Sequence, residues 1–173
     1  MKERITVDEV NRLRREAFVR RFGPLYEHSP WVAEEAYLER PFDGIDMLHE
    51  AMVRAVYAAP EARKMALIRA HPDLAGKAAV AGELTRESTR EQSSAGLDRL
   101  TPGEYGEFQR LNGAYREKFG FPMIFAVREH TRETILAGAE ERLQHSRQEE
   151  VDTALAEISK IARLRLEDLV ERD

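Results

Sequence analysis

The 173-residue chain contains no cysteine. It therefore cannot form a disulfide framework, a thiolate nucleophile, a cysteine-ligated zinc site or an iron–sulfur cluster. Its apolar runs stay far short of the ~20 residues that a membrane-spanning helix needs. Its first ten residues, MKERITVDEV, lack the apolar core of a secretory signal. We therefore expect a cytoplasmic protein that does not cross a membrane.

Positive charge is also in deficit, with 27 Lys and Arg against 32 Asp and Glu and a formal net charge of −5. An acidic total without a basic stripe argues against nucleic acid as a partner. Charged residues make up 34% of the chain without long blocks of one sign, which is typical of a solvated helical surface. Glycine-rich phosphate loops and the G-x-S-x-G elbow are missing too, so neither a nucleotide cofactor nor a serine nucleophile is expected.

Signals for helix starts, in contrast, are abundant. They lie at Thr6, Ser29, Asp43, Pro60, Thr85, Thr101, Thr131 and about Gln148. Apolar residues recur behind them at steps of three and four. We expect the first helix to cover residues 6–23 and the last to cover about 148–170. With no internal repeat and no linker, these eight or so helices predict an all-α, single-domain, non-repeat bundle over residues 1–173.

One apolar stretch does not fit this helical pattern. The run Phe121–Val127 has seven residues, which is too short for a typical helix. It could be buried extended chain, although periodicity alone does not distinguish the two.

Arg165 interrupts the apolar stripe of the last expected helix. The stripe runs Val151, Leu155, Ile158, Ala162, Arg165 and Leu169, at steps of four and three. A guanidinium at a core position needs a carboxylate partner, because burying an unpaired charge is very costly. That carboxylate belongs either to a ligand or to the protein itself. In a further interpretation, the arginine reaches solvent at an exposed helix end.

Ser88 and Glu91 fall on one face of the helix expected over residues 85–95, because residues three apart are neighbours on a helix. Their line is otherwise small and apolar, so Glu91 is a candidate acid or base. The pattern Ser88-x-x-Glu91 also matches a capping box, in which case the helix would start at Ser88.

His71 stands on a loop and precedes Pro72, which biases it towards an extended backbone. An imidazole aimed from such a loop can exchange a proton near neutral pH. Alternatively, His71 caps the end of the preceding helix. The pair His71-x-Asp73 is only a weak metal signal, because no second ligand motif accompanies it.

Several strings, in order along the chain, together resemble the 2-oxo-4-hydroxy-4-carboxy-5-ureidoimidazoline (OHCU) decarboxylase family. They are EHSPW from Glu27, HPDLAG from His71, LTRESTREQSSAGL from Leu84, LNGAYREKFGFP from Leu111 and IARLRL from Ile161. The resemblance covers nearly the whole chain. It implies an all-helical homodimer that acts on a small ureidoimidazoline in the last step from urate to allantoin, without metal or organic cofactor.

The same resemblance implies which residues form the site. His71 would be the proton donor, and Glu91 and Arg165 would complete the catalytic set. Substrate contacts are implied for Pro72, Ser88, Gln92, Met123, Ile124, Phe125, Ala126 and Val127. The last five correspond to a stretch whose backbone groups contact the flat ring of the ligand. Met123 stands where phenylalanine is usual, which changes the shape of the pocket rather than its chemistry.

Two other functions remain open from the sequence. In the first, the chain is a non-enzymatic helical interaction module, and its buried polar groups form a structural network. In the second, it is a hydrolase or a metal-dependent lyase that acts on a related ureide.

Overall fold

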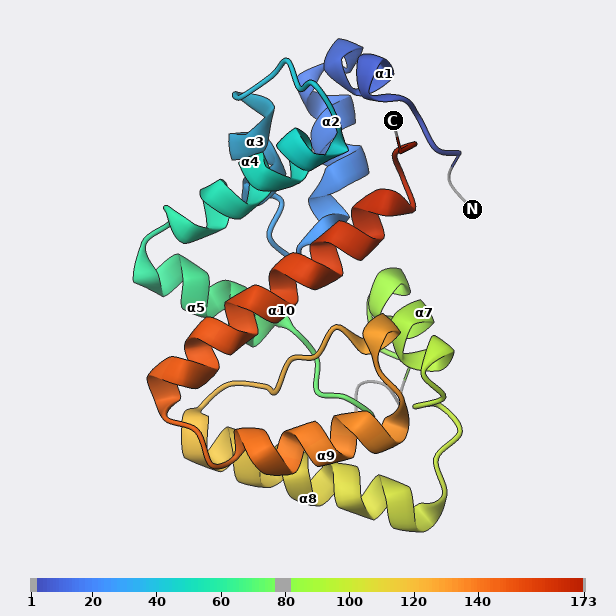
Figure 1. The fold of residues 1–173 in the computed structure, drawn as a ribbon, viewed down its shortest axis with the longest axis vertical. Coiled ribbons are helices and arrows are strands. Elements are labelled where there is room, and N and C mark those ends of the chain that lie inside the picture. Colours follow the sequence, from blue (N-terminus) through green and yellow to red (C-terminus); the bar gives the residue numbers. More distant parts are fainter. Residues whose placement is uncertain (1–2, 77–81, 173) are drawn as a thin grey trace. The chain divides into compact units, whose positions relative to one another are not determined.

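The computed structural model describes residues 3–76 and 82–172 (Figure 1). The chain divides into two compact units, Met1–Leu67 with Ser159–Asp173 (unit 1) and Ile68–Ile158 (unit 2). Regular structure in the described residues is helical, apart from an isolated bridge between Ile5 and Val170. The all-α prediction is therefore confirmed. One domain over residues 1–173 stays a prediction.

Unit 1 is built mainly from the N-terminal helices. Its elements are α1 (Val7–Arg12), α2 (Arg15–Phe22), η1 (Gly23–Leu25), α3 (Trp31–Tyr37) and α4 (Ile45–Tyr57), most of α5 (Glu61–Ala70), and the end of α10 (Arg147–Glu167). α3 packs against both α2 and α4 (Figure 1). Phe18 and Phe22 are fully buried in the core of this unit, with their rings edge to face.

The prediction of a single helix over residues 6–23 is wrong, because the helix is interrupted between α1 and α2. Leu13 and Arg14 have extended backbones, with ψ of 138° and 156°. Arg40 Nη1 donates to the carbonyls of Asn11 (3.0 Å) and Leu13 (2.9 Å). A remote side chain thus satisfies carbonyls that the end of α1 leaves without helical partners.

Two other expected helix starts are also wrong. α3 has no side-chain cap, and the Ser29 hydroxyl instead donates to the Glu27 carbonyl (2.8 Å). α4 follows Gly44 rather than Asp43. The threonine caps are confirmed at Thr6, Thr85, Thr101 and Thr131.

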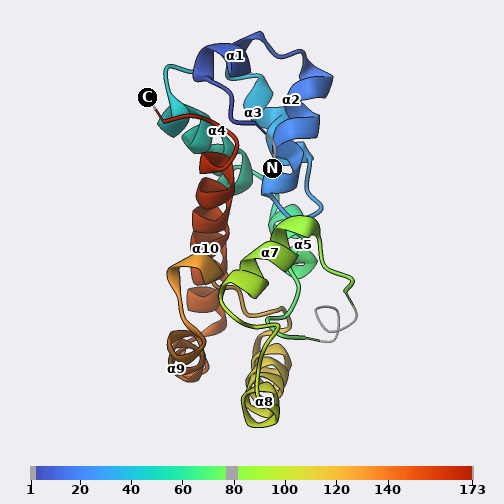
Figure 2. The ribbon, with the colours of Figure 1, turned by 90° about the vertical axis from the view of Figure 1, so that its right-hand side faces the viewer.

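Unit 2 contains ten of the eleven predicted site residues, all except Arg165, on its helices and on the segments that join them. Its elements are α7 (Arg86–Ser94), α8 (Pro102–Phe119), η2 (Val127–Glu129), α9 (Arg132–Arg142) and residues 147–158 of α10. α8 packs against α9, and Figure 2 shows both helices nearly end-on. α7 packs against η2. Residues 121–126 follow α8 in the sequence and lead into η2 without forming a regular strand, and all residues from 121 to 127 are buried.

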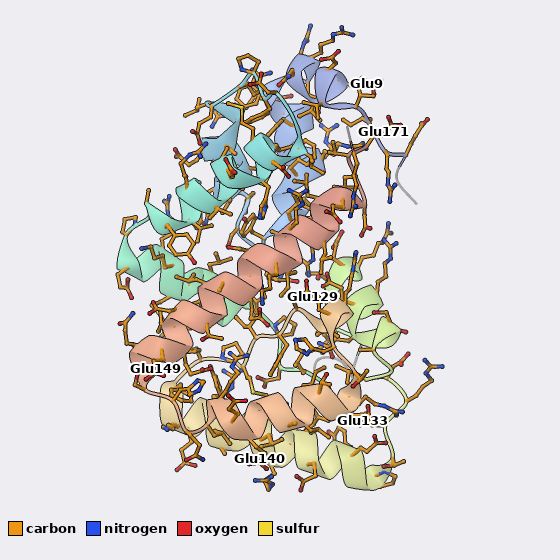
Figure 3. All side chains as sticks on the ribbon, in the orientation of Figure 1. Glu9, Glu129, Glu133, Glu140, Glu149 and Glu171 are labelled. Atoms are coloured by element: carbon orange, nitrogen blue, oxygen red, sulfur yellow. The ribbon has the colours of Figure 1, made fainter. Side chains whose placement is uncertain are left out.

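The acidic excess includes carboxylates on solvated faces of the helices and termini. Figure 3 labels Glu9, Glu129, Glu133, Glu140, Glu149 and Glu171, all of which are exposed. None of the helices in the described part of the chain is both long and apolar enough to span a membrane.

Candidate active site

The HPDLAG loop, residues 71–76, contains a residue in an unfavourable backbone conformation. Ala75 has φ of +51°, in the left-handed region that costs a non-glycine residue ~1 kcal/mol or more. Both of its peptide groups are held by side chains. The Ala75 N–H donates to Gln92 Oε1, and Gln109 Nε2 donates to the Ala75 carbonyl, each at 2.9 Å. Two helices therefore hold this turn in place.

Neighbouring residues of the loop are held in the same way. Asn112 Nδ2 on α8 donates to the Leu74 carbonyl at 2.8 Å, and Arg116 pairs with the Asp73 carboxylate at 2.9 Å. A Cβ atom on Gly76 would lie 2.8 Å from Asp73 Cβ, so this close approach requires glycine. The loop is thus preorganised by packing and hydrogen bonds, as a catalytic site requires.

His71 lies just after α5 at the start of this loop. The backbone N–H of His71 donates to the Ile68 carbonyl at 3.2 Å. His71 is 7% exposed, and Pro72 is half-buried. The described residues contain no group of three or more His, Asp or Glu side chains suited to a metal ion. His71 is therefore buried at the start of a braced loop, and its role towards a ligand stays a prediction.

Ser88 and Glu91 lie inside α7 rather than at its start. The helix begins at Arg86, and the Thr85 hydroxyl caps it by accepting from the Ser88 N–H at 3.2 Å. The interpretation of Ser88-x-x-Glu91 as a capping box is therefore wrong. Both side chains are buried, as their shared helix face predicts.

Gln92 has a role that the sequence did not indicate. Besides accepting from Ala75, its Nε2 donates to the Asp73 carbonyl at 3.3 Å. Its amide thus ties α7 to the HPDLAG loop. Whether it also contacts substrate stays a prediction.

Residues Met123–Val127 are the third part of the predicted site within unit 2, and all five are buried. Since α7 packs against η2, which begins at Val127, this segment ends beside the helix that carries Glu91. Unit 2 therefore holds the HPDLAG loop, α7 and the segment together.

Arg165 belongs to unit 1, where it has a protein carboxylate as partner. Its Nη2 donates to Glu27 Oε1 at 2.9 Å, and its Nη1 donates to the Pro24 carbonyl at 3.2 Å. Arg165 is 4% exposed and Glu27 is 2% exposed. The interpretation of Arg165 as one partner of an internal ion pair is thus confirmed, and the interpretation in which it reaches solvent is wrong. Glu27 was missed as a candidate, although it begins one of the strings that carry the family resemblance.

Comparisons with known proteins agree on one family. The OHCU decarboxylase family model matches residues 11–167. The chain is 48% identical over 171 residues to the 2-oxo-4-hydroxy-4-carboxy-5-ureidoimidazoline decarboxylase of Halalkalicoccus jeotgali, covering 98% of this chain and 95% of that protein. It is 41% identical to the Mus musculus protein of the same name, covering 88% and 86% of the two chains.

A solved structure shares this fold. The crystal structure of an (S)-allantoin synthase superposes with a TM-score of 0.75 at 32% identity, over 96% of this chain. This chain spans 55% of the length of that crystallised chain.

Proposed function

This chain belongs to the OHCU decarboxylase family, and we propose that it is a carboxy-lyase that converts OHCU to (S)-allantoin and CO₂ in urate degradation. The observation that carries the proposal is the family match along nearly the whole chain. It coincides with a buried His71 on a braced loop in the unit that also holds Glu91.

The reaction requires little beyond correctly placed side chains. The bond between the ring carbon and the carboxylate breaks, CO₂ leaves, and the electron pair stays on the ring carbon. The adjoining C=N bond of the imidazoline ring takes up that pair, which gives an enol. The neighbouring ring carbon, which carries the ureido group, then takes up a proton, while the hydroxyl group on the carbon that lost CO₂ becomes the ring carbonyl of allantoin. The protein must turn the carboxylate out of the ring plane, remove water from around it and supply the proton from one face.

We assign these tasks to the predicted residues. His71 donates the proton and so determines the enantiomer. Glu91, with Ser88 and Gln92, hydrogen-bonds the polar edge of the substrate, and its charge disfavours the carboxylate before it leaves. Arg165 binds substrate oxygens through its planar fork of donors. Pro72 and the backbone of residues 123–127 line the ring.

Mixing the purified protein with freshly made OHCU tests the proposal, with CO₂ release and optical activity followed together. We expect CO₂ and one enantiomer of allantoin, and no loss of rate after chelation. Ammonia as the co-product, or inactivation by a chelator, would support a hydrolase or a metal-dependent lyase. No reaction at all would support an interaction module.

His71→Asn tests the central role in the same assay. Loss of a general acid lowers rates by about 10²- to 10⁴-fold. His49→Asn is the matched control, because His49 lies on α4 in unit 1, and it should keep the wild-type rate. A folded His71→Asn protein with the wild-type rate would remove His71 from the mechanism.

The assembly and location of the chain are further parts of the proposal. A homodimer, which the family resemblance implies, should have twice the 19.9 kDa mass of one chain in light scattering. A monomer at assay concentration would contradict it. The cytoplasmic location expected from the sequence is tested by cell fractionation.

A further inference from the structure

Glu150, at the start of α10, is fully buried, and three side chains converge on its carboxylate. The Tyr115 hydroxyl (2.5 Å) and Arg142 Nε (2.7 Å) donate to Oε1, and His145 Nδ1 lies 2.9 Å from Oε2. Burial, together with the hydrogen bond to Glu150, raises the pKa of the Tyr115 phenol, so its hydroxyl stays a donor. We call these four side chains the Glu150 cluster. None of them is among the site residues predicted above.

Arg142 joins this cluster to the predicted ring-binding segment. Its Nη1 donates to the Ile124 carbonyl at 2.5 Å, and its guanidinium carbon lies 4.6 Å from the centre of the Phe125 ring. The rigid fork of a guanidinium lets Nε bind Glu150 while Nη1 binds the peptide. The carboxylate thus orients the guanidinium, and the guanidinium orients the backbone.

Phe125 is held from further directions. The His130 ring meets it edge to face at 5.2 Å, and a Cβ atom on Gly138 would lie 3.1 Å from it. At the residue that follows Phe125, the Ala126 N–H donates to Glu157 Oε1 in a long hydrogen bond of 3.4 Å. Side chains therefore hold the carbonyl before Phe125 and the N–H after it.

We propose that Arg142 is a positioning residue, which acts through the Ile124 carbonyl to set how the backbone of residues 124–126 meets the substrate ring. The inference rests on the proposed function, because that function places the ring against this segment. Peptide groups cannot adapt by changing rotamer, so a small backbone displacement weakens every contact that they make. Productive geometry has to be kept within about 0.5 Å.

Arg142→Lys tests the proposal. One ammonium cannot reproduce the fork that binds Glu150 and Ile124 together, although it keeps the positive charge. Because the segment binds the ring before and during reaction, KM for OHCU should rise about tenfold while kcat changes less. Amide hydrogen exchange should become faster in residues 123–127. The matched control is Arg110→Lys, since Arg110 forms an exposed ion pair with Glu140 of α9. It should leave KM and exchange unchanged.

A purely structural cluster gives a different result. Arg142→Lys would then lower the unfolding temperature, but at 25 °C the folded protein would keep the wild-type KM and exchange, and this outcome overturns the proposal. If Arg142→Lys does not fold, Gly138→Ala decides, because its methyl group displaces the Phe125 ring without removing a charge. A folded Gly138→Ala protein with the wild-type KM would also overturn it.

Wild-type activity keeps this proposal separate from the function on which it rests. A wild-type protein that is inactive on fresh OHCU overturns the proposed function. Hydrogen exchange then tests the role of Arg142 by itself. Unchanged exchange of residues 123–127 in Arg142→Lys overturns that role. If Arg142→Lys does not fold, unchanged exchange in Gly138→Ala overturns it.

Discussion

Replacing Glu27 by leucine should destabilise the protein strongly, because it leaves the Arg165 guanidinium without its carboxylate. Their atoms lie 2.9 Å apart, and both side chains are almost fully buried. Removing one partner of a buried ion pair costs about 3–5 kcal/mol, since the other charge remains away from water. The entropy of unfolding is about 2.1 cal/mol/K per residue, so for 173 residues this cost lowers the unfolding temperature by about 8–14 °C.

The assay is denaturant unfolding followed by fluorescence of Trp31, the single tryptophan, which lies in unit 1 with both partners. Arg165→Met should cost a similar amount. The double variant Glu27→Leu/Arg165→Met should cost much less than the sum of the two, because no unpaired charge is left.

Asp46→Asn is the control for this cycle. It breaks the ion pair between Asp46 and Arg163 in the same unit, where the Asp46 side chain is 78% exposed. Such a pair contributes about 0–1 kcal/mol. If Glu27→Leu costs no more than Asp46→Asn, or if the double variant costs the full sum, the reasoning about the buried pair is refuted.

Three further predictions concern activity and pH. Arg165→Lys should stay folded but lose at least about tenfold in kcat/KM, because an ammonium cannot replace the fork; an unchanged value would make Arg165 only structural. Gln92→Leu leaves the Ala75 N–H unpaired, which costs about 1–3 kcal/mol, and it should lower activity more than Gln92→Glu, which keeps that acceptor; equal activities would contradict the bracing role. Burial, and then the Arg163 guanidinium, lower the pKa of His49. The unfolded chain therefore takes up this proton first, and stability present above pH ~6.5 is lost as the pH falls towards the lowered pKa. His49→Asn should lose less stability than wild type between pH 7.5 and 5 in thermal unfolding, and equal losses would exclude His49.

The sequence pattern also indicates three buried charged residues that were not among the predicted site residues. Arg142 continues the line of Ile135 and Ala139 at steps of four and three, and Glu150 lies on one line with Ala154 and Glu157. All six are buried. The reasoning that singled out Arg165, a charge on an apolar stripe, would have found Arg142, Glu150 and Glu157 as well.

The sequence pattern does not indicate which groups pair with buried charges such as Arg165 and Arg142. Glu27 and Arg165 are 138 residues apart, and Ile124 and Arg142 are 18 apart. No periodicity relates such pairs, because helical neighbours lie only three or four residues apart. The sequence therefore predicted a carboxylate for Arg165 without indicating which one.

The all-α class, the threonine caps and the burial of Ser88, Glu91 and Arg165 follow from the sequence itself, because caps and helix faces depend on residues within one turn of each other. Tertiary structure decided the break in the first helix, the partner of Arg165 and the bracing of the HPDLAG loop by Gln92. Each of these depends on a hydrogen bond between groups that are distant in the chain, and only folding brings such groups within 3 Å or so of each other.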